Sequence, residues 1–133
     1  MNLQNVKVRK LFSGYRVQFA YLFGSRATGK KTIKQSDYDI AILFGAGTAA
    51  LRFATRLQLL HELQELFAPI RVDLIVLDDI NSATLRYEVV RTGRLLYSRD
   101  ESRRMDFELR AMDEYQDFSP FLKAYGNAYI GNV

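Results

Sequence analysis

The sequence contains no cysteine, no tryptophan, a single histidine and two prolines among its 133 residues. Without cysteine, the chain cannot hold a disulfide, a zinc ribbon, an iron–sulfur cluster or a cysteine nucleophile. No apolar run approaches the roughly 18 residues that a membrane span requires, and the basic N-terminus is unlike a secretory signal. We therefore expect a cytoplasmic protein with no membrane association. A chain of this length buries about 65–70% of its unfolded surface, which is enough for one core without further support.

Positive charge is concentrated in the first third of the chain. Lysine and arginine outnumber aspartate and glutamate by 19 to 15, a net charge of +4. Residues 1–40 contain eight basic and two acidic residues, a balance of +6, whereas residues 41–133 contain eleven and thirteen, a balance of −2. Such a local excess suits a polyanion, either nucleic acid or a triphosphate, or it keeps a basic helix in solution. Composition alone favours the solvated helix.

Hydrophobic periodicity predicts helices interleaved with short strands. Strands are expected over 17–23, 38–44, 71–77 and 95–97. Helices are expected over 3–13, 51–67, 82–92 and 100–117, followed by a last helix that starts at Ser119-Pro120 and runs to 129. Strands that alternate with helices indicate a small α/β sheet. The short spacing between the first two strands leaves open whether they pair in parallel or antiparallel fashion.

Three sets of apolar residues recur at helical spacing. In the helix 51–67 the expected apolar face is Phe53, Leu57, Leu60, Leu63 and Phe67, and the other side carries Arg52, Arg56, Glu62 and Glu65. In the helix 100–117 one face carries Met105, Leu109 and Met112. A terminal aromatic stripe, which either packs on the chain's own core or faces a partner, consists of Tyr115, Phe118, Phe121, Tyr125 and Tyr129.

The segment 23–43 combines a glycine-serine pair with two aspartates. Gly24 and Ser25 follow a predicted strand. A residue without a side chain lets the backbone approach a ligand there, and the serine offers a hydroxyl and an N–H to a phosphate. Asp37 and Asp39 start the next strand two residues apart, so their carboxylates project from one face. Two carboxylates held together favour a divalent cation such as Mg²⁺, which prefers carboxylate and phosphate oxygens.

A third aspartate lies inside a later strand. Asp73 is the only charged residue between 72 and 77. An ionised carboxylate in a buried strand is costly unless it is paired or bound to a metal. Asp73 is therefore either the partner of Arg71 or another arginine, or the third ligand beside Asp37 and Asp39. We favour the ligand.

These motifs resemble the signature of the DNA polymerase β-like nucleotidyltransferase superfamily: Gly-Ser, a spacer, Asp-x-Asp and a further strand-borne Asp. The details GSRATG and SDYDIAIL are most similar to the minimal nucleotidyltransferase (MNT) antitoxins, which are partners of HEPN-domain ribonuclease toxins. The resemblance covers residues 15–97. It implies the polymerase β-like nucleotidyltransferase fold, a small mixed sheet of about four strands flanked by helices over 1–97. Residues 98–133 would form a helical C-terminal extension of the same domain.

The resemblance also implies an activity, transfer of AMP from ATP to a hydroxyl of the HEPN toxin, a tyrosine in that family. Gly24 and Ser25 would hold the nucleotide phosphates. Mg²⁺ would be bound, and the displacement of pyrophosphate catalysed, by three carboxylates, Asp37, Asp39 and Asp73. Asp73 would in addition help to deprotonate the attacking hydroxyl. We accordingly expect a hetero-oligomer with the toxin rather than a complex with nucleic acid.

Several charged residues keep more than one interpretation. Arg26, beside Ser25, either neutralises phosphate charge or faces solvent. Lys30, Lys31 and Lys34 form a solvated loop or steer ATP or RNA; they lie in a spacer of eleven residues where about ten are usual in the family. The lone His61 has no partner for a metal or catalytic role.

Two other functions stay open. A non-catalytic antitoxin would occlude its partner by binding alone, although all three metal carboxylates are present. A nucleotidyltransferase acting on a small molecule would usually need a larger acceptor domain, and only 36 residues follow the last predicted strand.

Overall fold

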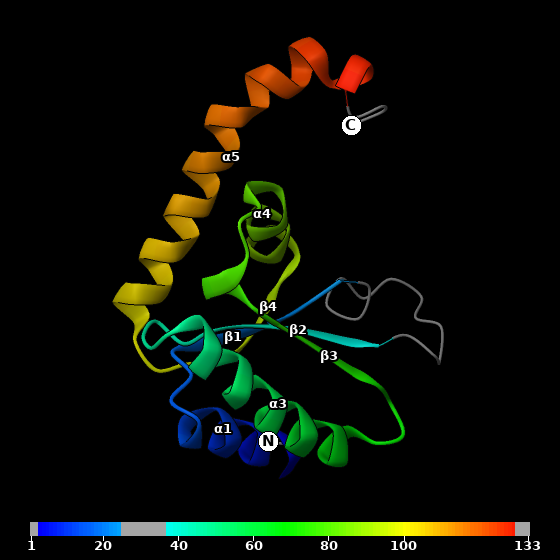
Figure 1. The fold of residues 1–133 in the computed structure, drawn as a ribbon, viewed down its shortest axis with the longest axis vertical. Coiled ribbons are helices and arrows are strands. Elements are labelled where there is room, and N and C mark those ends of the chain that lie inside the picture. Colours follow the sequence, from blue (N-terminus) through cyan, green and yellow to red (C-terminus); the bar gives the residue numbers. More distant parts are fainter. Residues whose placement is uncertain (1–2, 25–36, 130–133) are drawn as a thin grey trace.

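The structure, a computed structural model, describes the backbone of residues 3–24 and 37–129 and the side chains of residues 5–24 and 37–116. Along the chain the elements are α1 (Leu3–Gly14), β1 (Phe19–Phe23), β2 (Tyr38–Leu43), α3 (Ala49–Phe67), β3 (Val72–Val76), the 3-10 turn η1 (Leu77–Asp79), α4 (Ala83–Thr92), β4 (Arg94–Ser98) and α5 (Glu101–Tyr129) (Figure 1). The expected strands and the first three expected helices are confirmed to within two residues at each end. None of the described helices combines the length and apolarity that crossing a membrane requires.

The four strands form one mixed sheet in the order β3-β2-β1-β4. β1 is antiparallel to both β2 and β4, whereas β2 and β3 are parallel. The antiparallel pairing of β1 with β2 answers the question that the sequence left open. The small mixed sheet flanked by helices confirms the expected polymerase β-like fold class, and β3 and β4 are its two edge strands.

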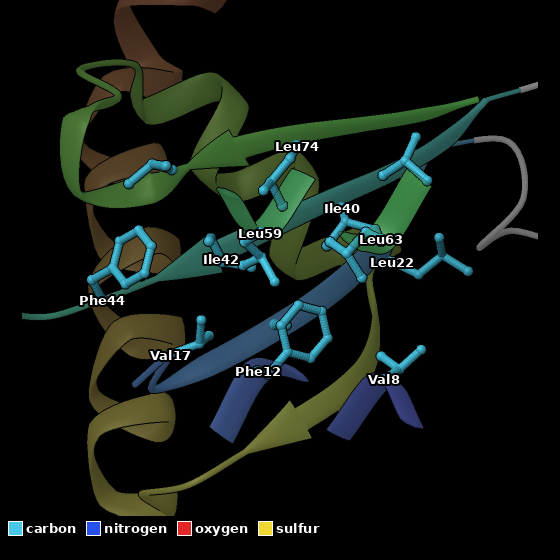
Figure 2. Close-up of a cluster of buried hydrophobic side chains, with 13 residues drawn as sticks. Val8, Phe12, Val17, Leu22, Ile40, Ile42, Phe44, Leu59, Leu63 and Leu74 are labelled. Carbon is cyan, nitrogen blue, oxygen red and sulfur yellow. The ribbon is translucent and has the colours of Figure 1, made fainter. Parts of the chain in front are cut away.

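Helices cover both faces of the sheet. α1 and α3 pack on one face through the cluster shown in Figure 2, which comprises Val8, Phe12, Val17, Ala20, Leu22, Ile40, Ile42, Phe44, Leu59, Leu63, Val72, Leu74 and Val76. α4 and α5 pack on the other face through Val89 and Phe107 against Phe19, Tyr21 and Ala41. Because successive strand residues point to opposite faces, Ile40 and Ile42 belong to the first cluster and Ala41 to the second.

The buried face of α3 differs from the one expected. Leu63 is fully buried as predicted, but Leu59 is buried with it, and Phe53 and Leu57 are 58% and 49% exposed. The expected polar side is wrong for two arginines, because Arg52 and Arg56 reach toward β3 and the turn that follows it.

The physical reason is that α3 lies along an edge strand whose backbone groups need partners. Arg56 Nε donates to the carbonyl oxygen of Leu74 at 2.7 Å. The Gln64 side chain accepts from the N–H of Val72 at 2.9 Å and donates to the carbonyl oxygen of Ile70 at 2.8 Å. Polar residues of α3 thus cover the open side of β3, and the apolar face is rotated accordingly.

The C-terminal region also departs from expectation. The predicted break at Ser119-Pro120 is wrong, since α5 continues as one helix from Glu101 to Tyr129 and curves at its C-terminal end (Figure 1). A proline inside a helix removes one N–H and its ring crowds the carbonyl of the preceding turn, and a helix can accommodate both by bending instead of ending. Met105, Leu109 and Met112, the expected apolar face, are all exposed. Of the predicted aromatic stripe, Tyr115 stacks on Tyr87, and the side chains of the others lie outside the described residues.

Candidate active site

The predicted site residues meet at one end of the sheet. β1 ends at Phe23, next to Gly24, while β2 begins directly after Asp37 and β3 begins one residue before Asp73. Since β1 is antiparallel to β2 and β2 is parallel to β3, the end of β1 and the starts of β2 and β3 lie side by side. In the register Asp39 is opposite Phe23 on one side and Asp73 on the other.

The carboxylates share the face of the sheet that carries α4. Residues paired in register point to the same face, so Asp39 and Asp73 project together, opposite to the buried Ile40 and Leu74. Asp37, two residues before Asp39, projects to the same side. Asp37 and Asp39 are half-buried and Asp73 is exposed, so the site is open to solvent.

The exposure of Asp73 corrects the argument made from the sequence. The sequence pattern predicts a buried strand around Asp73, but β3 is an edge strand and this side chain reaches water. Asp73 is close enough to Asp39 for its negative charge to raise the pKa of the Asp39 carboxyl. Its position therefore favours the shared acidic site over an ion pair with Arg71.

Gly24 is required by both its backbone and its surroundings. It adopts φ +80°, a left-handed conformation that residues with a side chain rarely take. A Cβ atom at this position would lie 2.7 Å from Asp39 Oδ2. A side chain at position 24 would therefore collide with the carboxylate of Asp39, and the predicted approach of the Gly24 backbone to a ligand phosphate stays a prediction.

The electrostatics of the site centre on Asp39. Partial burial raises the pKa of its carboxyl above the ordinary value, and the charges of Asp73 and Asp37 raise this pKa further. Both effects disfavour the ionised carboxylate. A cation placed among the three groups would relieve this repulsion.

The donor set fits a hard divalent cation. All three candidates supply carboxylate oxygens, and the chain has no cysteine to favour a softer metal. Among the described residues, no three acidic or histidine side chains are close enough to enclose an ion on their own. Any Mg²⁺ bound here would therefore need further ligands besides the carboxylates, such as the phosphate oxygens of a nucleotide and water.

Part of the predicted site lies outside the described residues, namely Ser25, Arg26, Lys30, Lys31 and Lys34. The structure brings together Gly24, Asp37, Asp39 and Asp73. It adds Phe23, a half-buried residue in register with Asp39 that sequence reasoning did not single out. Strand alternation from the buried Tyr21 could have placed Phe23 on the acidic face.

A mixed sheet with Gly24 and strand-borne aspartates at one end is the arrangement expected of a nucleotidyltransferase domain. The chain belongs to the polymerase beta nucleotidyltransferase family, whose model matches residues 6–102. No curated protein sequence matches this chain.

Solved structures narrow the likeness to toxin–antitoxin proteins. A toxin–antitoxin structure with AMP-PNP is 27% identical, with a TM-score of 0.72 over 92% of this chain and 94% of that one. A Shewanella oneidensis complex of a tri-AMPylated HEPN toxin with its MNT antitoxin contains a chain 26% identical, with a TM-score of 0.64 over 92% of both chains. The toxin–antitoxin structure MntA–HepT contains a chain that is 25% identical, with a TM-score of 0.65 over 93% of this chain and 94% of that one. These likenesses agree with the MNT resemblance of the motifs.

Proposed function

We propose that this chain is an antitoxin that transfers AMP from ATP to a tyrosine hydroxyl of a HEPN-domain toxin encoded by the neighbouring gene, and thereby neutralises it. The observation that carries the proposal is the pairing of Asp39 with Asp73 beside Gly24 at the open end of the sheet. Support comes from relatives solved with AMP-PNP and with an AMPylated HEPN toxin.

Each residue of the site has a role in this reaction. Gly24, Ser25 and Arg26 bind the phosphates of ATP. Mg²⁺ would neutralise charge on the triphosphate when bound, and its ligands would be Asp37, Asp39 and Asp73 together with phosphate oxygens of the nucleotide. The acceptor oxygen attacks the α-phosphorus, and the bond from that phosphorus to the bridging oxygen breaks, so pyrophosphate leaves. Asp73, the exposed carboxylate, takes up the proton of the attacking hydroxyl.

Geometry explains why these residues suit such a step. The backbone of Asp39 is paired with strands on both sides, which fixes where its side chain starts, while the open end admits a large acceptor. A preorganised site lowers the barrier because little reorganisation accompanies the charge that develops. Since ATP is the donor, we place this activity in the cytoplasm.

Transfer of the α-phosphate of ATP tests the proposal. The purified chain is mixed with α-labelled ATP, Mg²⁺ and the neighbouring HEPN protein. We expect label on the HEPN protein, and a loss of about 100-fold or more in Asp39→Asn and Asp73→Asn, because each removes a charged donor from the reacting centre. Glu65→Gln, at an exposed position on α3, is the matched control and should label at the wild-type rate.

Unlabelled HEPN protein, or labelling that Asp39→Asn does not reduce, would contradict AMP transfer. Rescue from the toxin in cells separates the remaining possibility. If Asp73→Ala rescues growth as fully as the wild-type chain, binding alone neutralises the toxin and the chain acts by occlusion.

A further inference from the structure

Helix α5 carries an exposed apolar stripe. Met105, Leu109 and Met112 are 55%, 60% and 42% exposed, and they recur at steps of four and three residues along one side of the helix. Large apolar side chains clustered at such exposure mark an interaction site more often than scattered ones do. We call these three residues the stripe.

The stripe is not a displaced part of the chain's own core, because another side of α5 already packs on the domain. The rings of Phe107 and Phe19 lie 5.2 Å apart, and those of Tyr115 and Tyr87 stack at 3.8 Å. The Tyr21 hydroxyl donates to Glu108. Turning the stripe inward would break these contacts, so α5 is held with the stripe facing solvent.

Polar contacts hold α5 in the same orientation. Arg86 of α4 pairs with Glu114 of α5 at 2.6 Å, and Glu108, the acceptor of the Tyr21 hydroxyl, also pairs within α5 with Arg104 at 2.7 Å. Ala111, the residue between these acidic positions, is 1% exposed. The inner side of α5 is therefore satisfied without any contribution from Leu109 or its neighbours in the stripe.

The length of α5 also points to a partner. At 1.5 Å per residue its 29 residues span about 43 Å. Figure 1 shows the helix passing α4 and continuing beyond it, away from the sheet. A helix owes most of its stability in water to packing one face on another surface. A second surface laid along α5 would stabilise it.

The spacing and charge of α5 describe its occupant. Apolar residues at four- and three-residue steps match the side of a helix that packs against another helix. Apart from the inner residues Arg104, Glu108 and Glu114, residues 101–116 contain two basic and three acidic residues, a balance of −1 in a chain of +4. An amphipathic helix with basic residues beside its apolar face would complement this surface.

The relatives connect this surface with a toxin. The match to a chain in the complex of HEPN toxin with MNT antitoxin covers 92% of the present chain. The unmatched 8% of 133 residues is about 11 residues, fewer than the 29 of α5. Most of α5 thus belongs to the architecture shared with an antitoxin that was solved on its toxin.

We propose that the stripe Met105, Leu109 and Met112 is the docking surface for a helix of the HEPN partner. The identity of the partner rests on the proposed function, whereas the surface rests on the exposure and packing of α5. Docking here would hold the toxin on the side of the sheet covered by α4 and α5, the side to which Asp39 and Asp73 project.

Affinity for the HEPN protein tests the surface. Leu109→Glu should raise Kd by about 10-fold or more, because a charge would be buried at the centre of the interface. Leu57→Glu is the matched control on α3, with 49% exposure, and should bind within about twofold of wild type. Both melting temperatures should stay within about 2 °C of wild type, since both sites are exposed. If Leu109→Glu fails to fold, Met105→Gln with Met112→Gln replaces it.

A fluorescent label gives an independent measurement, because the chain has no cysteine of its own. An environment-sensitive dye on Leu109→Cys should shift to the blue when the HEPN protein is added, and the same dye on Leu57→Cys should not. A shift at both positions, or at neither, would speak against docking on the stripe.

The outcomes separate this proposal from the proposed function. If Leu109→Glu binds and labels the HEPN protein like wild type, the docking surface is wrong and AMP transfer stands. If only Leu109→Glu loses binding while the wild-type chain transfers no AMP, the surface stands and the activity is wrong. If the chain alone sediments as a dimer that Leu109→Glu dissociates, the occupant is a second copy and the proposal fails.

Discussion

Single residues at the end of the sheet determine how the acidic site is built. Gly24 leaves room for the carboxylate of Asp39, and Asp39 in turn stands between Phe23 and Asp73. Partial burial raises the pKa of the Asp39 carboxyl, and repulsion by Asp73 and Asp37 raises this pKa further. The site is thus electrostatically strained without a cation, a common property of functional sites.

Replacement of Gly24 should disturb the site more than the fold. In Gly24→Ala the new Cβ would meet Asp39 Oδ2 at 2.7 Å, and the φ of +80° disfavours alanine. We expect a loss of about 1–2 kcal/mol in the free energy of unfolding and at least about a 10-fold loss in AMP transfer as Asp39 is displaced. Urea denaturation and the labelling assay measure the two effects.

Gly14→Ala is the control for this substitution. Gly14 ends α1 outside the left-handed region, and a Cβ atom there would meet no atom of the described residues within 4 Å. Alanine at this position should therefore leave labelling unchanged and should not lower the free energy of unfolding, which a compatible alanine raises by up to about 1 kcal/mol. A Gly24→Ala protein as stable and active as Gly14→Ala would refute the steric role of Gly24.

The raised pKa of Asp39 predicts a pH-dependent stability. Because the folded state holds this proton more tightly than the unfolded state, Asp39 lowers stability as pH rises above its unfolded pKa. In metal-free buffer, Asp39→Asn should therefore melt a few degrees higher than wild type at pH 7, and the difference should vanish at pH 3. Thermal melts followed by circular dichroism measure this shift.

The opposite sign is expected for Asp79. Its hydrogen bond with Arg52 lowers the pKa of the Asp79 carboxyl, so its contribution to stability is present at neutral pH and lost in acid. Asp79→Asn should lower the melting temperature at pH 7. The same direction of change in Asp39→Asn would disprove the repulsion at the site.

At the scale of elements, α3 shows that a helix can be placed correctly while its buried face is not. Periodicity locates the helix, but the face depends on what lies beside it. The edge of β3 offers backbone groups to Arg56 and Gln64, and both side chains turn toward them. Long polar side chains near a sheet edge are therefore a poor guide to the solvent-facing side of a helix.

Removing one of these contacts should destabilise the sheet edge. Arg56→Met keeps the apolar stem but leaves the carbonyl oxygen of Leu74 without its donor at 2.7 Å. We expect a loss of about 1 kcal/mol in the free energy of unfolding, measured by urea denaturation. Arg91→Met, which removes only an exposed i,i+3 ion pair on α4, is the control and should change stability by less than about 0.5 kcal/mol. Equal losses in the two variants would exclude edge protection by Arg56.

At the scale of the molecule, the mixed pairing gathers residues that are far apart in the sequence. The antiparallel pairing of β1 with β2 brings Gly24 to Asp39, and the parallel crossover through α3 brings Asp73 to the same end. The helices α4 and α5 cover the rest of that face through Val89 and Phe107. On this face of the sheet, the part under α4 and α5 stabilises the fold, and the end that carries the aspartates stays open to solvent.

Much of this could be predicted from the sequence, for local reasons. Strand and helix positions follow from periodicity, and Ser82 caps α4 through its hydroxyl as its residue type suggests. Asp37 and Asp39 share a face because strand geometry alternates. The exposure of Asp73 could not be predicted, because whether a strand is central or at an edge depends on pairing between distant segments.

Spacing along neighbouring residues was enough to establish the order of the elements, the residue types of the acidic site and, through the motifs, the nucleotidyltransferase resemblance. Three further properties came from the folded chain alone. β2 pairs with β1 and β3 at once, Asp39 occupies the space left by Gly24, and the stripe Met105, Leu109 and Met112 faces solvent. The reason is that burial and charge repulsion depend on which distant surfaces meet, and a one-dimensional pattern does not contain that information.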